Sequence, residues 1–196
     1  VFEGKTPGSP IAHLIRNELM DQDDEPLDGH VEVDETWVGG KLRFKGRQGF
    51  TGPVPGSKSL ANKTPVAGAV SRGGRVVAVT VPNVRKATLL GHIERRVLPS
   101  ATVYTDELKS YDSLTKRGYA HERINHSEHV YVSGDVHTNT IEGFWSLVKN
   151  GLRGVHHSVS AKHLQGYLNE YAWRYNHRQQ RERSMFEALL LRSVGS

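Results

Sequence analysis

The strongest constraint on the fold is a β-hairpin pattern in the first half of the chain. Two runs rich in β-branched and small apolar residues, 65–70 and 75–81, are joined by Ser71-Arg72-Gly73-Gly74. Short glycine-containing turns between such runs are typical of antiparallel hairpins. The fold must therefore contain a sheet, and its class depends on the segments around this hairpin.

The segments around the hairpin alternate between strand and helix patterns. Further strands are predicted at 29–39, 102–105 and 121–125. Apolar residues at helical spacing predict helices at 11–20, 87–98, 111–117, from 139 onward, and at 159–177. Residues 46–63 lack periodicity and predict a long mobile loop. The order predicts one α/β domain, a mixed sheet flanked by helices, with an additional helix towards the C-terminus.

The length and composition fit one soluble domain. The chain has 196 residues and a mean hydropathy of −0.53, which allows one well-buried domain. We expect this domain at 29–180, preceded by residues 1–28 and followed by a tail at 181–196. No apolar run is long enough to cross a bilayer and no leader opens the sequence, so we expect a cytoplasmic protein without a membrane partner. The absence of cysteine excludes disulfides and thiolate zinc sites.

The basic residues are concentrated in two blocks. The net charge is +5 and the pI about 9.5. One block contains no acidic residue and consists of Lys41, Arg43, Lys45, Arg47, Lys58 and Lys63. The other lies near the C-terminus and consists of Arg174, Arg178, Arg181 and Arg183. Such blocks suit a polyanion such as nucleic acid, although solvated surface charges explain them equally well.

Three acidic residues occupy positions where metal chemistry would need them. Asp34 lies inside the predicted strand 29–39, Asp106 follows the strand 102–105, and Glu142 opens the helix after 139. Magnesium prefers oxygen ligands, and two ions about 4 Å apart can hold both the attacking and the leaving oxygen of a phosphodiester. Carboxylates from separate elements that converge at one edge of a sheet would form such a site.

Each of these acids also has a structural explanation. Asp34 has acidic neighbours, with Glu32 on its own face of the strand and Glu35 on the opposite face, and fits an exposed strand position. Asp106 fits a turn. The run from Asn139 to Glu142 resembles a capping box, in which Glu at the third position bonds back to the N-cap residue. Only the three acids together favour a catalytic role.

The helix that contains Glu142 presents a polar face. Glu142, Ser146 and Lys149 lie at i, i+4 and i+7 and therefore share that face. A metal ligand beside a phosphate-binding lysine would have this pattern, and so would an ordinary solvated face. His137 precedes the helix and either orients a ligand, contacts a phosphate or simply begins the helix.

Five segments together resemble the ISXO-like bacterial insertion-sequence transposases, and they span residues 31–176. They are VEVDETWVGGK at 31–41, VYTDE at 103–107, NHS at 125–127, HTNTIEGFWSLVK at 137–149 and YLNEYAWRYN at 167–176. The motif at 137–149 is the most specific. Asp106 and Glu142 are separated by 35 residues (107–141), which is similar to the spacing in the DDE transposases.

The resemblance implies a ribonuclease-H-like fold in which Asp34, Asp106 and Glu142 are catalytic and bind two Mg²⁺ or Mn²⁺ ions. The implied reaction is hydrolytic nicking at the transposon ends, followed by attack of the freed 3′-hydroxyl on target DNA. Lys149 matches the downstream basic residue, and Asn139 is an alternative to Glu142 because some relatives use Asn as the third ligand. The implied partners are transposon-end and target DNA, bound by a homo-oligomer in the bacterial nucleoid.

Relatives of this type usually begin with a cysteine zinc ribbon and a helix-turn-helix, which this sequence lacks. We therefore expect residues 1–28 to be the remnant of that region and a linker, and we expect no zinc. We predict weak, non-specific DNA binding whose affinity falls as salt rises. The predicted DNA contacts are the two basic blocks together with His137, Asn139 and Lys149.

Two other functions would use the same residues. A ribonuclease-H-like nuclease or resolvase would perform hydrolysis only, and a catalytically silent DNA-binding remnant would bind no metal. A histidine zinc site is a third idea, at His121, His126 and His129 or at the pair 156–157, but no recognised ligand spacing is completed there. Scattered surface histidines explain that pattern better.

Overall fold

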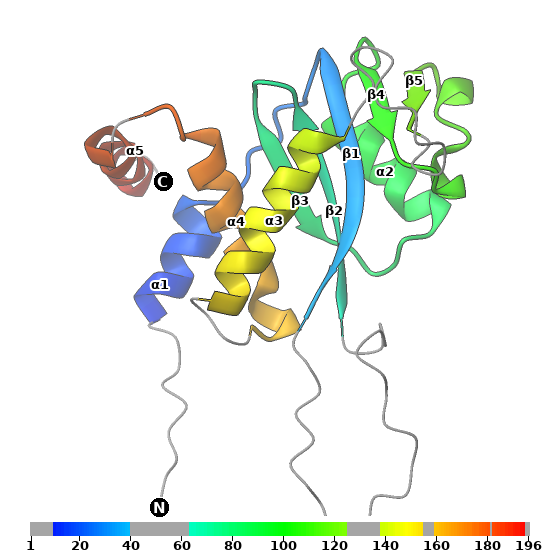
Figure 1. Ribbon diagram of the computed structural model, residues 1–196. Helices are drawn as coiled ribbons and strands as arrows, with labels where there is room; N and C mark the ends of the chain where they lie inside the picture. Colours follow the sequence, from blue (N-terminus) through cyan, green and yellow to red (C-terminus); the bar gives the residue numbers. More distant parts are fainter. Residues whose placement is uncertain (1–9, 40–62, 125–137, 155–158, 181, 195–196) are drawn as a thin grey trace, which may run out of the picture.

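The chain folds around one mixed five-stranded sheet (Figure 1). The computed structural model describes residues 10–39, 63–124, 138–154, 159–180 and 182–194. The strands lie in the order β3-β2-β1-β4-β5, and their bounds are β1 His30–Val38, β2 Thr64–Ser71, β3 Val76–Thr80, β4 Thr102–Thr105 and β5 Ala120–Arg123. The predicted hairpin is confirmed as β2 and β3. The loop predicted at 46–63 lies outside the described residues except for Lys63.

Strand direction changes at the centre of the sheet. β1 pairs antiparallel with β2 from Val31 to Val38, and β2 pairs antiparallel with β3. On its other side β1 pairs parallel with β4, and β4 pairs parallel with β5. The predicted α/β class, a mixed sheet flanked by helices, is therefore confirmed.

The helices agree with the sequence pattern except at the C-terminus and at 111–117, where the predicted short helix is instead two separate 3-10 turns. Their bounds are α1 Pro10–Leu14, α2 Lys86–Arg96, α3 Asn139–Gly154, α4 Ala161–Asn176 and α5 Glu182–Val194. The single-turn segments are η1 Ile15–Leu19, η2 Lys109–Tyr111 and η3 Thr115–Arg117. η3 ends at Gly118, whose φ of 90° is left-handed and favours glycine. In the described part of the chain, none of the helices combines the length and the apolar character needed to cross a bilayer.

Two hydrophobic cores lie on opposite faces of the sheet. Alternation along β2 separates them: Ala67 and Ala69 face the core that contains α2, whereas Val66 and Val70 face the core that contains α3 and α4. The α2 side also includes Val31, Val33, Leu89, Leu90, Ile93 and Tyr111, and the α3–α4 side includes Ile141, Phe144, Val148, Leu164, Leu168 and Ala172. The central strand is consequently covered on both faces.

The N-terminal and C-terminal segments pack together on α4. Arg16 in η1 forms a half-buried ion pair with Glu170 in α4, at 2.6 Å. Arg192 in α5 donates to the carbonyl oxygens of Leu19 and Asp21 at 2.8 and 3.1 Å. Residues 182–194, expected as part of a tail, are helical. The sequence pattern missed this helix because its apolar residues are spread around the helix instead of forming one stripe.

Three amide side chains cover the outer edge of β3. Asn176 accepts from the backbone N–H of Val76 at 2.8 Å and donates to its carbonyl at 3.0 Å. Gln22 makes the same pair of bonds to Ala78, both at 2.8 Å, and Gln165 accepts from the N–H of Thr80 at 2.8 Å. These amides satisfy backbone groups that a further strand would otherwise pair with.

We expect Asn176→Ala to lower the free energy of unfolding by about 1–2 kcal/mol, because the N–H and carbonyl of Val76 lose a partner in a half-buried position. Urea denaturation followed by circular dichroism measures this change. The exposed Gln180→Ala on the following turn is the matched control and should stay within about 0.5 kcal/mol of wild type. Equal stability of the two variants would show that the amide edge does not stabilise the sheet.

Candidate metal centre

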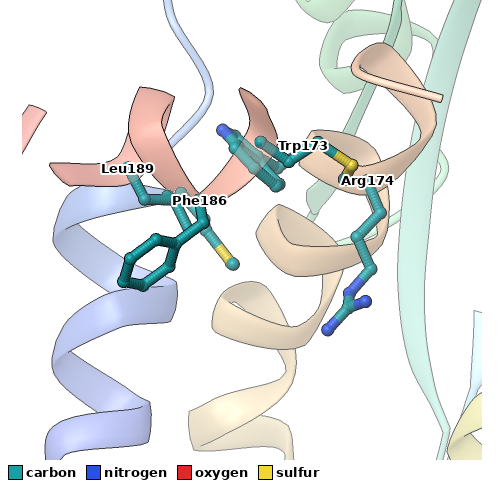
Figure 2. Close-up of a pocket in the computed structure, with 6 residues that line it drawn as sticks. Trp173, Arg174, Phe186 and Leu189 are labelled. Carbon is teal, nitrogen blue, oxygen red and sulfur yellow. The ribbon is translucent and has the colours of Figure 1, made fainter. Parts of the chain in front are cut away.

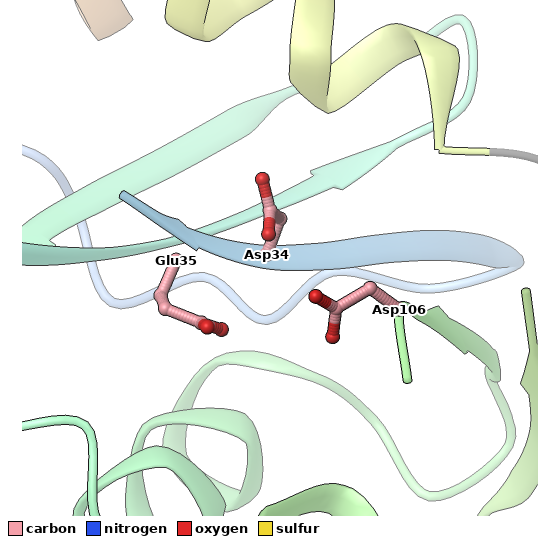
Figure 3. Close-up of side chains that lie close together, drawn as sticks. All are labelled: Asp34, Glu35 and Asp106. Atoms are coloured by element: carbon pink, nitrogen blue, oxygen red, sulfur yellow. The ribbon is translucent and has the colours of Figure 1, made fainter. Parts of the chain in front are cut away.

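Three carboxylates gather where β1 extends beyond β4 (Figure 3). Asp34, Glu35 and Asp106 each offer an oxygen, and these oxygens all lie within 4.8 Å of one another. Asp34 and Glu35 are adjacent in β1, and Asp106 follows the last residue of β4. Among the residues that the structure describes, no other group of three acidic or histidine side chains could hold a metal ion.

Glu35 was not among the residues that the sequence singled out, because strand alternation placed it on the face opposite Asp34. The structure explains how both reach Asp106. The pairing of β4 with β1 ends at Glu32, so at Asp34 and Glu35 the edge of β1 has passed the end of that ladder. Side chains from both faces can therefore turn around the edge. In the sequence, the sign of this arrangement is the pair of consecutive acids, Asp34 and Glu35, which follow the part of β1 that pairs with β4.

Burial, with a smaller contribution from the clustered negative charge, raises the pKa of two of these carboxyls. Burial raises the pKa of Asp34 to about 6, and the nearby Asp106 carboxylate adds to this effect. Burial likewise raises the pKa of Glu35 to about 7, against a hydrogen bond from Tyr111 that lowers it. Both carboxyls therefore bind protons more tightly than exposed acids do. A bound cation would relieve the same repulsion.

Hydrogen bonds hold two of the three carboxylates in place from opposite sides of the sheet. The buried Tyr111 donates its hydroxyl to Glu35 at 2.8 Å. From α3, the indole N–H of Trp145 donates to Asp34 Oδ2 at 3.0 Å. Asp106 accepts instead from the backbone N–H of Leu108, at 3.0 Å. The orientation of each carboxylate is therefore set by a neighbour.

Glu142 lies outside the group of three. It is exposed on the first turn of α3, and its carboxylate accepts from the hydroxyl of Thr138 at 3.2 Å. Its charge still reaches the cluster, since it is the smallest of the causes that raise the pKa of Asp34. Asn139, the alternative third ligand, is exposed at the start of the same helix and is likewise outside the group of three.

The predicted DNA contacts are only partly within the described residues. Lys149 is half-buried on α3; burial lowers its pKa, and the charge of Asp34 opposes this shift. Lys63, just before β2, is near enough for its charge to act on Lys149. In the C-terminal block, Arg174 pairs with Glu170 and the guanidinium of Arg178 lies 4.1 Å from the centre of the Tyr175 ring. The remaining predicted contacts of the first block, Lys41, Arg43, Lys45, Arg47 and Lys58, lie outside the described residues, as do Arg181 and His137.

The histidines gain no support as a zinc site in the described segments. His121 hydrogen-bonds to the buried Thr105 hydroxyl at 2.9 Å. Residues 126, 129, 156 and 157 lie outside the described residues.

A cavity of about 380 Å³ between α4 and α5 (Figure 2) is lined by Met20, Trp173, Arg174, Met185, Phe186 and Leu189. Because no carboxylate lines this cavity, it does not compete with the carboxylate cluster as a metal site.

Gly68 allows α3 to approach the cluster. It is paired with Asp34 across the β1–β2 ladder. A Cβ atom at this position would lie 2.5 Å from the Trp145 ring, much closer than atoms can pack. The absence of a side chain at Gly68 therefore makes room for the indole that donates to Asp34.

We expect Gly68→Ala to lower the free energy of unfolding by about 1–3 kcal/mol, because the added methyl overlaps Trp145. Urea denaturation measures the loss, and a change in tryptophan fluorescence should accompany it. Gly91→Ala, inside α2 with open space around it, is the control and should raise stability by about 0.5–1 kcal/mol. If Gly68→Ala were as stable as wild type, the close approach of Trp145 at Gly68 would not be a constraint.

Comparison with known proteins gives the family of this chain. Residues 26–176 match the ISXO2-like transposase domain. The chain is 40% identical over 102 residues to an uncharacterized transposase-like protein of Haemophilus influenzae, covering 52% of this chain and 81% of that protein. It is 32% identical over 160 residues to an uncharacterized protein in transposable element ISH50 of Halobacterium salinarum, covering 76% of this chain and 52% of that protein.

A solved structure shows a weaker likeness. A chain in the intasome of simian T-cell lymphotropic virus, in complex with PP2A regulatory subunit B56 gamma, aligns with a TM-score of 0.45 and 14% identity, over 80% of this chain and 51% of that one. The family match covers most of the chain and includes both strands and the helix that carry the predicted acids. The chain belongs to the ISXO2-like transposase domain family.

Proposed function

We propose that this chain is the catalytic domain of a DNA transposase that cleaves phosphodiester bonds at transposon ends and joins the freed 3′-hydroxyl to target DNA. The observation that carries this proposal is the convergence of Asp34, Glu35 and Asp106 at one edge of the sheet. Membership of a transposase family supports the same reaction class. Recognition of the transposon ends, which a complete transposase also requires, is likewise proposed.

The donor chemistry of the cluster fits Mg²⁺ or Mn²⁺. All three side chains offer carboxylate oxygens, which these hard cations prefer over nitrogen or sulfur. Asp34, Glu35 and Asp106 would hold the ions, and Glu142 would complete the set from α3. Two such ions, when bound, polarise the phosphodiester and lower the pKa of the attacking water or hydroxyl.

Neighbouring side chains orient the carboxylates that would bind the metal ions. Trp145 fixes one oxygen of Asp34, and Tyr111 fixes Glu35, so that the carboxylates are arranged before an ion arrives. Lys149 lies close enough to Asp34 for the Asp34 charge to act on its pKa. A lysine at this position would bind a DNA phosphate next to the metal site.

The decisive substitution is Asp106→Asn, which keeps the shape of the side chain and removes its charge. We expect it to weaken Mn²⁺ binding in calorimetry and to reduce the nicking of supercoiled plasmid at least about 100-fold. Glu107→Gln changes the adjacent, exposed acid and is the matched control, for which both measurements should equal wild type. Failure of the wild-type chain to bind Mn²⁺ would contradict the proposal.

Strand transfer is tested separately from hydrolysis. A pre-cleaved transposon-end oligonucleotide with a free 3′-hydroxyl should become joined to plasmid DNA by the wild-type chain but not by Asp106→Asn. Nicking without joining would instead indicate a nuclease or resolvase. Metal binding without either reaction would contradict the catalytic role proposed for this chain.

Metal affinity should depend on pH because protons compete for the same oxygens. With pKa values of about 6 for Asp34 and about 7 for Glu35, Mn²⁺ binding at pH 5.5 must release protons, and the apparent affinity should rise about tenfold or more between pH 5.5 and pH 8. Calorimetry in buffers of different ionisation enthalpy measures the protons released. A pH-independent affinity would exclude these carboxyls as ligands.

In the metal-free protein, these two carboxyls lower the free energy of unfolding as the pH rises, whereas the metal affinity rises over the same range. The folded-state pKa values of Asp34 and Glu35 are higher than those of the unfolded chain, so folding favours the protonated carboxyls. Their contribution is fully present below about pH 4 and is lost as the pH rises through about 6 to 7. The metal-free chain should therefore lose stability over this range, and Mn²⁺ should restore it at pH 8.

A further inference from the structure

Glu32 is a completely buried carboxylate in β1 that the proposed reaction does not use directly. Its relative exposure is 0%, and it lies on the same face of the strand as Asp34, towards α3. Its oxygens accept from the backbone N–H groups of Thr140 and Ile141 at 2.8 and 3.0 Å and from the Thr140 hydroxyl at 2.9 Å. A strand carboxylate thus binds the first turn of a helix more than 100 residues later in the sequence.

The bonds to Glu32 replace the usual cap of that helix. The first N–H groups of an α-helix have no partner within the helix and are commonly satisfied by the side chain of the preceding residue. In α3 that residue is Thr138, and its hydroxyl donates to Glu142 instead. The predicted capping box, in which Glu142 would bond back to the helix start, is therefore replaced by a bond between side chains. The negative charge of Glu32 also suits the positive end of the helix.

The burial of Glu32 is compensated by Arg72 from the β2–β3 turn. The guanidinium Nε donates to Glu32 at 2.8 Å, and its carbon lies 4.2 Å from the centre of the Tyr104 ring. The Tyr104 hydroxyl is in turn hydrogen-bonded to His30 at 2.9 Å. An ion pair of this kind adds little to stability compared with apolar packing. It does restrict the position of the Glu32 carboxylate.

The contacts of Glu32 and Asp34 together attach α3 to β1 on both sides of Glu142. Thr140 and Ile141, bound by Glu32, immediately precede Glu142, and Trp145, bound to Asp34, follows it by less than one turn. The polar face that carries Glu142 is therefore held at a fixed height and rotation relative to β1. The bond between Thr138 and the exposed Glu142 does not connect α3 to β1, so it would not by itself fix the helix relative to the strand.

We propose that Glu32 is a positioning residue that sets the first turn of α3 so that the Glu142 carboxylate can complete the metal site of Asp34 and Asp106. This inference rests on the proposed function. It assigns Glu32 no contact with the metal or with DNA. Its effect on metal binding should therefore pass through Glu142.

A double-mutant cycle on the whole chain tests this route. Mn²⁺ affinity is measured by calorimetry for wild type, Glu32→Gln, Glu142→Gln and the double variant. We expect Glu32→Gln to weaken Mn²⁺ binding about tenfold when Glu142 is present and to have little further effect when Glu142 is already replaced. The exposed Glu122→Gln on β5 is the control and should bind as wild type does.

A folding defect is separated from the positioning effect by a milder variant. Thr140→Val keeps the side-chain shape and removes one of the bonds to Glu32, so it should weaken Mn²⁺ binding in the same direction by a smaller factor. If circular dichroism shows that Glu32→Gln does not fold, the same cycle is made with Thr140→Val and Glu142→Gln.

The outcomes distinguish this inference from the proposed function. Equal Mn²⁺ affinity of wild type and the Glu32 or Thr140 variant would overturn the inference while leaving the metal site intact. An equal loss with and without Glu142 would overturn it too, because the route through Glu142 would be excluded. Absence of Mn²⁺ binding by the wild-type chain would overturn the proposed function itself.

Discussion

The pairing between β1 and β4 determines where the carboxylates meet. These parallel strands are in register only from His30 to Glu32 on β1, and β1 then continues alone on that side while remaining paired with β2 along its length. Asp106 leaves β4 at this step, opposite the next residues of β1. Because the ladder stops there, acids from both faces of β1 can approach one oxygen cluster.

The carboxylate cluster is unfavourable for the metal-free protein, and the surrounding structure is arranged to tolerate it. Burial and mutual repulsion raise the pKa of both Asp34 and Glu35, so the charged forms oppose folding at neutral pH. Trp145 and Tyr111 provide hydrogen bonds from the two opposite layers of helices, and their apolar rings pack in the two cores. The side chains that orient the site are therefore also those that anchor it, which gives a rigid arrangement of donors.

The attachment of α3 to the sheet follows the same principle of joining packing to polar contacts. Its apolar stripe covers the face of β2 that carries Val66 and Val70, and Gly68 between them leaves the space that Trp145 occupies. The polar contacts of Glu32 then fix the rotation of the first turn, which hydrophobic packing alone does not define. At the far edge, the amides of Gln22, Gln165 and Asn176 hydrogen-bond the N-terminal segment and α4 to β3. The helices on this side of the sheet are therefore held by directional hydrogen bonds as well as by the burial of apolar surface.

The sequence by itself determined the strands, most helices and the family. Local alternation and helical spacing are sufficient for β1, the β2–β3 hairpin, α2, α3 and α4, because each element buries one regular set of side chains. It did not determine α5, whose apolar residues follow no single stripe, and it could not show that Glu35 joins Asp34 and Asp106, because that depends on where the neighbouring strand ends. It also assigned Glu142 a possible cap within its own helix, whereas the cap comes from Glu32, 108 residues away from Thr140. Hydrophobic periodicity is a local property that any segment carries with it, but the partners of buried charges are chosen only when distant segments meet, and so only the tertiary structure decided them.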